Sequence, residues 1–149
     1  PHRSNKIPST VNVHILTVPN DAIRERKGFT GADWWFDEAG DLQVRVAAEL
    51  TDWREAMALA LHEAAEALMS KHMGITVQQV DDYDAKFEAE HPGDGTTDVG
   101  DLHDCPYRVP HNYATAMERV FAGAVELSWR EYDERLCALT DGYVPRPTA

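Results

Sequence analysis

The sequence predicts an α+β domain in which a small N-terminal antiparallel sheet, a hairpin plus one strand, packs on three helices. Apolar residues recur with a period of two in the first 50 positions, whereas from Asp52 onward they recur at helical spacing. Strands followed by helices are typical of an α+β fold. The chain has 149 residues and 43% hydrophobic content, which suffice for one core. We therefore expect a single domain over residues 1–149.

Three runs predict the strands. Residues 11–17 alternate between apolar and polar side chains before Pro19. Residues 33–36 and 42–46 are β-rich and flank a short acidic connection that contains glycine, which is the pattern of a β-hairpin. The charged stretch 21–30 predicts only a short helical turn or a loop.

Helical spacing predicts three helices, over residues 52–73, 76–90 and 110–138. Thr76 and Gln79 have the spacing of a capping box at the start of the second helix. The first helix is expected to bury one apolar stripe. This stripe comprises Met57, Leu61, Ala64 and Leu68.

Two segments are expected to lack regular structure. Residues 92–109 form a long loop rich in Gly and Asp, and loops of this length are more often functional or mobile than idle. Residues 139–149 contain two prolines and are expected to form a C-terminal tail.

The charge and the cysteine content restrict the partners and the compartment. The net charge of -12 disfavours binding to nucleic acids and to anionic membranes. No apolar run approaches the roughly 18 residues of a membrane span, and no export signal is readable. Cys105 and Cys137 show no C-x-x-C spacing, which favours a reducing compartment. We expect a cytoplasmic protein without nucleic-acid or membrane partners.

The most informative motif is His62-Glu63-x-x-Glu66 in the first predicted helix. Residues four apart share one helical face, so His62 and Glu66 can bind one metal ion. An imidazole nitrogen and a carboxylate oxygen are good ligands for zinc, although another divalent metal is possible. Glu63 projects about 100° around the helix from His62, where it can bind a water molecule held by the metal. The competing interpretation is an amphipathic helix with an exposed His and exposed Glu residues.

A third ligand must come from outside this helix. His111 is the first candidate because it supplies a second nitrogen, and Glu118 is the second. They lie seven residues apart on one helical face, about 10.5 Å along the axis, so both can be ligands only if their side chains converge. For each residue the alternative is a helix cap or an exposed position.

The predicted hairpin followed by a helix with His62-Glu63-x-x-Glu66 resembles the zincin metallopeptidases, whose motif is H-E-x-x-H with the Glu as general base. Residues 59–129, which include Cys105-Pro106-Tyr107, His111 and Glu118-Arg119, also resemble small uncharacterised phage and prophage proteins of H-E-x-x-E type. The resemblance covers about half of the chain, and Glu66 stands where zincins have their second His.

The resemblance implies a minimal zincin-like fold and a zinc-dependent, peptidase-like hydrolase with Glu63 as its base. It implies that the substrate or partner is a peptide or a protein. If a phage encodes the chain, the resemblance implies that the protein is located in the host cytoplasm or in the virion. The likeness to zincins with a downstream Glu ligand favours Glu118 over His111.

Two other functions stay open. One is a catalytically inactive, zincin-like binding or phage structural protein that retains a metal site. The other is a nucleotide phosphohydrolase of HD type, with His103-Asp104 as its dyad and His62 as partner. Cys105-Pro106 follows this dyad directly, which suits a loop better than the helix which that family uses.

Overall fold

The computed structural model of the chain describes residues 10–27, 31–94 and 97–140. This part contains three strands, five α-helices and one short 3-10 helix. They are β1 (Val13–Val18), α1 (Asn20–Lys27), β2 (Ala32–Phe36), β3 (Leu42–Ala47), α2 (Trp53–His72), α3 (Val77–Glu90), η1 (Val99–Asp101), α4 (Arg108–Ala124) and α5 (Trp129–Thr140). The predicted α+β class is therefore confirmed. No helix within these ranges is both long enough and apolar enough to cross a membrane.

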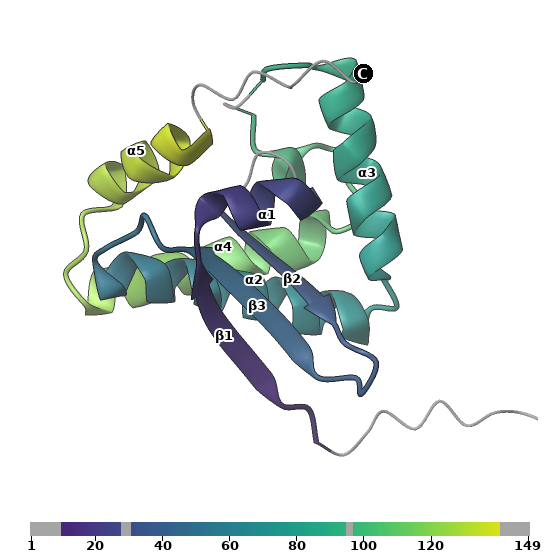
Figure 1. Cartoon of the computed structure of the whole chain (residues 1–149), viewed down its shortest axis with the longest axis horizontal. Helices are drawn as coiled ribbons and strands as arrows, with labels where there is room; N and C mark the ends of the chain where they lie inside the picture. The colour runs from purple at the N-terminus through teal and green to yellow at the C-terminus, as the bar shows by residue number, and fades with distance from the viewer. Residues whose placement is uncertain (1–9, 28–30, 95–96, 141–149) are drawn as a thin grey trace, which may run out of the picture.

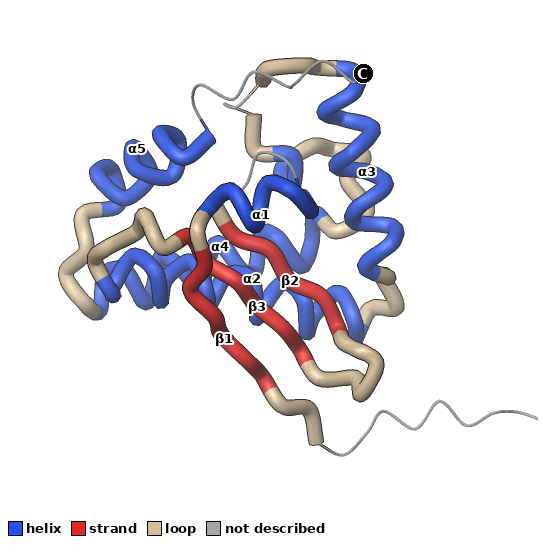
Figure 2. Tube along the Cα trace, in the orientation of Figure 1, coloured by secondary structure: helices blue, strands red, loops and turns tan. Residues whose placement is uncertain are grey.

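The three strands form one small sheet in the order β1-β3-β2 (Figure 2). The predicted hairpin of β2 and β3 is confirmed, with Trp34 opposite Val44. The expectation of a fully antiparallel sheet is wrong, because β1 pairs with β3 in parallel. After α1 the chain enters β2 in the direction opposite to β1. The hairpin then reverses it once more and places β3 between the two, so β3 runs the same way as β1.

The core lies between the sheet and α2. Alternate residues of β3, Leu42, Val44 and Val46, are almost fully buried, and small residues of α2 such as Ala60 and Ala67 are buried too. In Figure 1, α2 and α4 lie behind the sheet, whereas α3 and α5 stand on either side of α1. One side of α2 therefore faces the rest of the protein along the length of the helix.

Two predicted helices match α2 and α3 closely. Asp52 caps α2 by accepting a hydrogen bond from the Arg54 backbone N–H. The capping box of α3 is present in both directions: the Thr76 hydroxyl accepts from the Gln79 N–H at 3.2 Å, and the Gln79 side chain accepts from the Thr76 N–H at 2.9 Å. Local hydrogen bonding at the first turn therefore fixes where each helix begins.

The C-terminal part differs from the prediction of one helix over residues 110–138. It forms two helices, because α4 ends at a Schellman motif. Glu126 adopts a left-handed φ of 55°, and the Leu127 N–H returns to the Ala122 carbonyl at 2.9 Å. The side chain of Leu127 is buried, which favours the reversal. This break and helix α1 give five helices instead of the three expected.

The predicted loop and tail need smaller corrections. Helix α4 begins at Arg108, before the predicted start at Pro110, and η1 lies within the segment predicted as loop. Leu139 and Thr140 belong to α5 and not to a tail. The rest of the predicted tail, residues 141–149, lies outside the described residues.

The predicted buried stripe of α2 is also wrong. Met57, Leu61 and Ala64 are only partly buried, and Leu68 is 39% exposed. The face that α2 buries instead carries several polar side chains. The polar side chains are Glu55, His62, Glu66 and Ser70. Apolar Leu59 is buried as well. Polar groups withdrawn from water need partners, so this face points to a site.

The capping box gives a test of the fold. Thr76→Ala removes the hydroxyl acceptor for the Gln79 N–H, and we expect the free energy of unfolding to fall by about 1 kcal/mol. Urea denaturation measures this change. Thr76→Ser keeps the hydroxyl and should stay near the wild type. Equal losses for both variants would mean that the cap hydrogen bond does not stabilise α3.

Candidate metal centre

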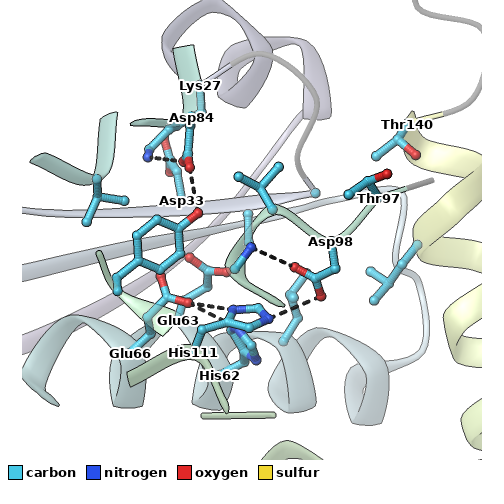
Figure 3. A pocket seen from close by; sticks show the side chains of 18 of the residues that line it. Lys27, Asp33, His62, Glu63, Glu66, Asp84, Thr97, Asp98, His111 and Thr140 are labelled. Atoms are coloured by element: carbon cyan, nitrogen blue, oxygen red, sulfur yellow. Dashed lines mark hydrogen bonds and ion pairs between the residues drawn. The ribbon is translucent and has the colours of Figure 1, made fainter. Parts of the chain in front are cut away.

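Three predicted ligands meet in the structure. One donor atom each of His62, Glu66 and His111 lies within 4.8 Å of the other two, and all three side chains are buried. Glu66 Oε2 is at the centre of the group, 3.3 Å from His62 Nε2 and 2.9 Å from His111 Nδ1. Figure 3 shows the three side chains converging at the base of a pocket. The group can hold a metal ion.

The convergence follows from how α4 packs along α2. His62 and Glu66 stand one turn apart on α2 and share a face. His111 lies in the first turn of α4, where it reaches Glu66. Glu118, two turns further along α4, reaches His62 instead. The two helices thus bring histidine and carboxylate side chains together across their interface.

Each of the three residues also uses its other polar atom. His62 Nδ1 is 2.8 Å from Glu118 Oε2. Glu66 Oε1 accepts a hydrogen bond from the Trp34 indole N–H at 3.0 Å. His111 Nε2 is 3.1 Å from Asp98 Oδ2. These contacts orient the rings and the carboxylate, so that the remaining atom of each residue faces the shared point.

Glu118 therefore occupies a different place from His111. Its Oε2 contacts His62 Nδ1, the nitrogen that faces away from Glu66, and its Oε1 accepts a hydrogen bond from the Tyr132 hydroxyl at 2.6 Å. Tyr132 is fully buried on α5. This geometry favours His111 as the third ligand and Glu118 as the carboxylate that orients His62.

The electrostatics of the group favour positive charge. Burial by itself lowers the pKa of His111, but hydrogen bonds to Asp98 and Glu66 outweigh it and raise that pKa to about 10. Burial by itself also lowers the pKa of His62. The hydrogen bonds to Glu118 and Glu66 outweigh burial and raise this pKa well above its usual range. Burial would raise the pKa of Glu66, yet the two histidines hold it below its usual range. A bound cation would therefore displace protons from the histidines.

The spacing and the donor types fit zinc. Ligand atoms at tetrahedral positions around zinc lie about 3.3 Å apart, given bond lengths of about 2.0–2.2 Å. The observed 3.3 Å and 2.9 Å are close to this value. Two imidazoles and one carboxylate form a donor set that catalytic zinc sites use, with a fourth position open to water or substrate.

A pocket of about 330 Å³ opens above the three residues. Elements α1, β2, α3 and α5 contribute to its walls, which mix apolar and charged side chains. Its lining includes Trp34, Leu59, Phe87, Leu136, Lys27 and Asp84. Lys27 is held by Asp84 at 3.1 Å, and Asp84 accepts a hydrogen bond from the Tyr107 hydroxyl at 2.5 Å. These contacts join Lys27, Asp84 and Tyr107 in one polar network that lines the pocket.

Glu63 lines this pocket beside the three residues. Its carboxylate makes no hydrogen bond to any residue in the part of the chain that the structure describes. Burial, and then the negative charge of Glu66, raise the pKa of Glu63 above its usual range. Without an ion, the Glu63 carboxyl therefore keeps its proton to a higher pH than an ordinary glutamate does.

Other candidate residues lie elsewhere. Asp33 also lines the pocket, but its side chain pairs with Arg45 at 2.6 Å and with Arg26 at 3.3 Å. His103 and Asp104, the dyad of the phosphohydrolase interpretation, lie in an exposed turn and do not line the pocket. They are not brought near His62.

Several partners of these residues could not be predicted from the sequence. Trp34 of β2 contacts Glu66, and Asp98, which caps η1, contacts His111. Tyr132 of α5 contacts Glu118. Their roles depend on tertiary packing and not on spacing within a motif. Asp98 had one weak signal, because it lies in the long loop that was expected to be functional or mobile.

Comparison with known proteins adds no relative: no protein-family model, curated protein or solved structure matches the chain. The resemblance to zincins and to the phage proteins stays a prediction. The function must be argued from the site itself.

Metal retention tests the ligand set. His62→Ala, Glu66→Ala and His111→Ala each remove one of three donors, so each should lose most of the zinc that the wild-type protein retains after desalting. Atomic emission measures the stoichiometry. His103→Ala, which changes an exposed histidine of a turn, is the matched control and should retain the metal.

Glu118→Gln separates a ligand from an orienting residue. It should still bind zinc, but about 10–100-fold more weakly, because only the hydrogen bond to His62 changes. Complete loss of zinc in Glu118→Gln, together with retention in His111→Ala, would make Glu118 the third ligand.

Proposed function

We propose that the chain is a zinc-dependent hydrolase of peptidase-like type. The observation that carries this proposal is the combination of three converging donors with a carboxylate in the same pocket, that of Glu63, which has no hydrogen bond to a described residue. A purely structural zinc site would have four protein ligands, whereas this donor set leaves one position open toward the pocket.

The residues have distinct roles in this proposal. His62, Glu66 and His111 bind the ion, and zinc when bound supplies a Lewis acid that activates water and polarises a carbonyl group. Glu63 accepts the proton of the attacking water and returns it to the leaving group. The positive charge of bound zinc would lower the raised pKa of Glu63, and a base with a pKa near neutrality can both take up and release a proton.

The pocket supports a peptide as the substrate. Its volume of about 330 Å³ is at the lower end of the range for ligand sites, so it accommodates a short segment of chain. Leu59, Phe87 and Leu136 provide an apolar wall on which a side chain can pack. The position of His103 and Asp104 outside the pocket gives no support to a phosphohydrolase. The inactive binding protein remains the alternative that an activity measurement distinguishes.

The role of Glu63 can be tested directly. Glu63→Gln keeps the size of the side chain but removes the base, so zinc content should be unchanged while peptide hydrolysis falls by about 10²-fold or more. We would incubate the zinc-loaded protein with a mixed peptide library and identify cleavage by mass spectrometry. Glu90→Gln, an exposed residue at the end of α3, is the matched control and should cleave like the wild type.

Two results would contradict the proposal. Equal cleavage by Glu63→Gln and the wild type would exclude Glu63 as the base. Full zinc occupancy without cleavage of any peptide would favour the catalytically inactive binding protein.

A further inference from the structure

The turn before α4 is packed directly against the imidazole of His111. Gly100, in η1, is buried, and a Cβ atom built on it would lie 2.3 Å from His111 Cγ and 2.5 Å from His111 Nδ1. Real Cβ atoms do not approach other atoms so closely. Only glycine therefore fits at position 100 while His111 keeps its present orientation.

The Asp98 side chain contacts both Gly100 and His111. Its Oδ1 accepts a hydrogen bond from the Gly100 N–H at 3.2 Å, which caps η1. Its Oδ2 lies 3.1 Å from His111 Nε2. One carboxylate thus fixes the backbone that covers the ring and also one of the two ring nitrogens. Figure 3 shows Asp98 and His111 joined in this way.

The His111 ring also lies against the ring of His62. The two imidazoles are 4.9 Å apart between ring centroids, with an angle of 69° between their planes. With Nε2 directed at Asp98, the nitrogen that faces Glu66 Oε2 is Nδ1, at 2.9 Å. A neutral imidazole has one lone pair and can bind one ion through one nitrogen.

We propose that Asp98 and Gly100 form a clamp that makes Nδ1 of His111 the metal donor, with Gly100 as a positioning residue. This inference rests on the proposed function, since it concerns the same ion. The competing arrangement uses Nε2 of His111 with Asp98 and Asp101, whose oxygens are 3.1 Å and 3.8 Å from it. Both acidic side chains are more than half exposed, so that site would lie at the surface. The two arrangements exclude each other.

The first test compares two glycine substitutions. Gly100→Ala should weaken zinc binding at least 10-fold, measured by competition with a chromophoric chelator, because the added methyl displaces the His111 ring. Gly123→Ala is the matched control: Gly123 lies in α4 and has open space where its Cβ would be. It should bind zinc within about 2-fold of the wild type. Equal affinities for both variants would overturn the clamp.

A second measurement identifies the nitrogen that binds the ion. In ¹⁵N-labelled protein, zinc should shift the Nδ1 resonance of His111 to the metal-bound range and leave Nε2 protonated. A zinc-bound Nε2 in the wild type would overturn the assignment and place the ion with Asp98 and Asp101.

A third measurement covers the case in which Gly100→Ala disturbs folding. We would compare urea midpoints, without metal, of the wild type, Gly100→Ala, His111→Ala and the double variant. If the methyl meets only the His111 ring, Gly100→Ala should lower the midpoint in the wild-type background and leave it unchanged in His111→Ala. An equal loss in both backgrounds would show that Gly100 is required for the turn itself and would overturn its role as a positioning residue.

These outcomes separate the two proposals. A wild-type protein that binds no zinc would overturn the clamp and the proposed function together. Normal zinc binding by Gly100→Ala would overturn the clamp alone.

Discussion

The structure depends on the partners that the buried side chains of His62 and Glu66 find along α2. His62 and Glu66 lie on the face that α2 turns toward the protein, and a buried charge without a partner would cost several kcal/mol. The partners come from separate elements: β2, the turn before α4, α4 itself and α5. They are Trp34, Asp98, His111, Glu118 and Tyr132. Satisfying these polar groups therefore fixes how the elements are arranged around one point.

The same partners support the catalytic role that we propose for this site. Hydrogen bonds on the far side of each ligand restrict its rotation, so binding an ion requires little rearrangement. The near side opens into the pocket, where the Glu63 carboxylate makes no hydrogen bond to a described residue. A fixed set of donors beside a free base is the arrangement that metal-assisted hydrolysis needs.

The sequence predicted those parts of the fold and site that local interactions determine. The capping box of Thr76, the hairpin and the pairing of His62 with Glu66 depend on residues close in the chain, so spacing was sufficient. The end of α4 was missed because Glu126, and not glycine, adopts the left-handed conformation. The face that α2 buries was misassigned because hydrophobicity ranks Leu68 above Glu66, whereas tertiary hydrogen bonds reverse that order. Contacts between distant segments carry no periodic signal.

The most direct test of the proposed zinc site is anomalous diffraction at the zinc edge from crystals grown with zinc. We expect one strong peak about 2.0–2.2 Å from His62 Nε2, His111 Nδ1 and Glu66 Oε2, on the side that faces the pocket. A peak beside Asp98 and Asp101, or no peak near His62 in crystals that contain zinc elsewhere, would contradict it.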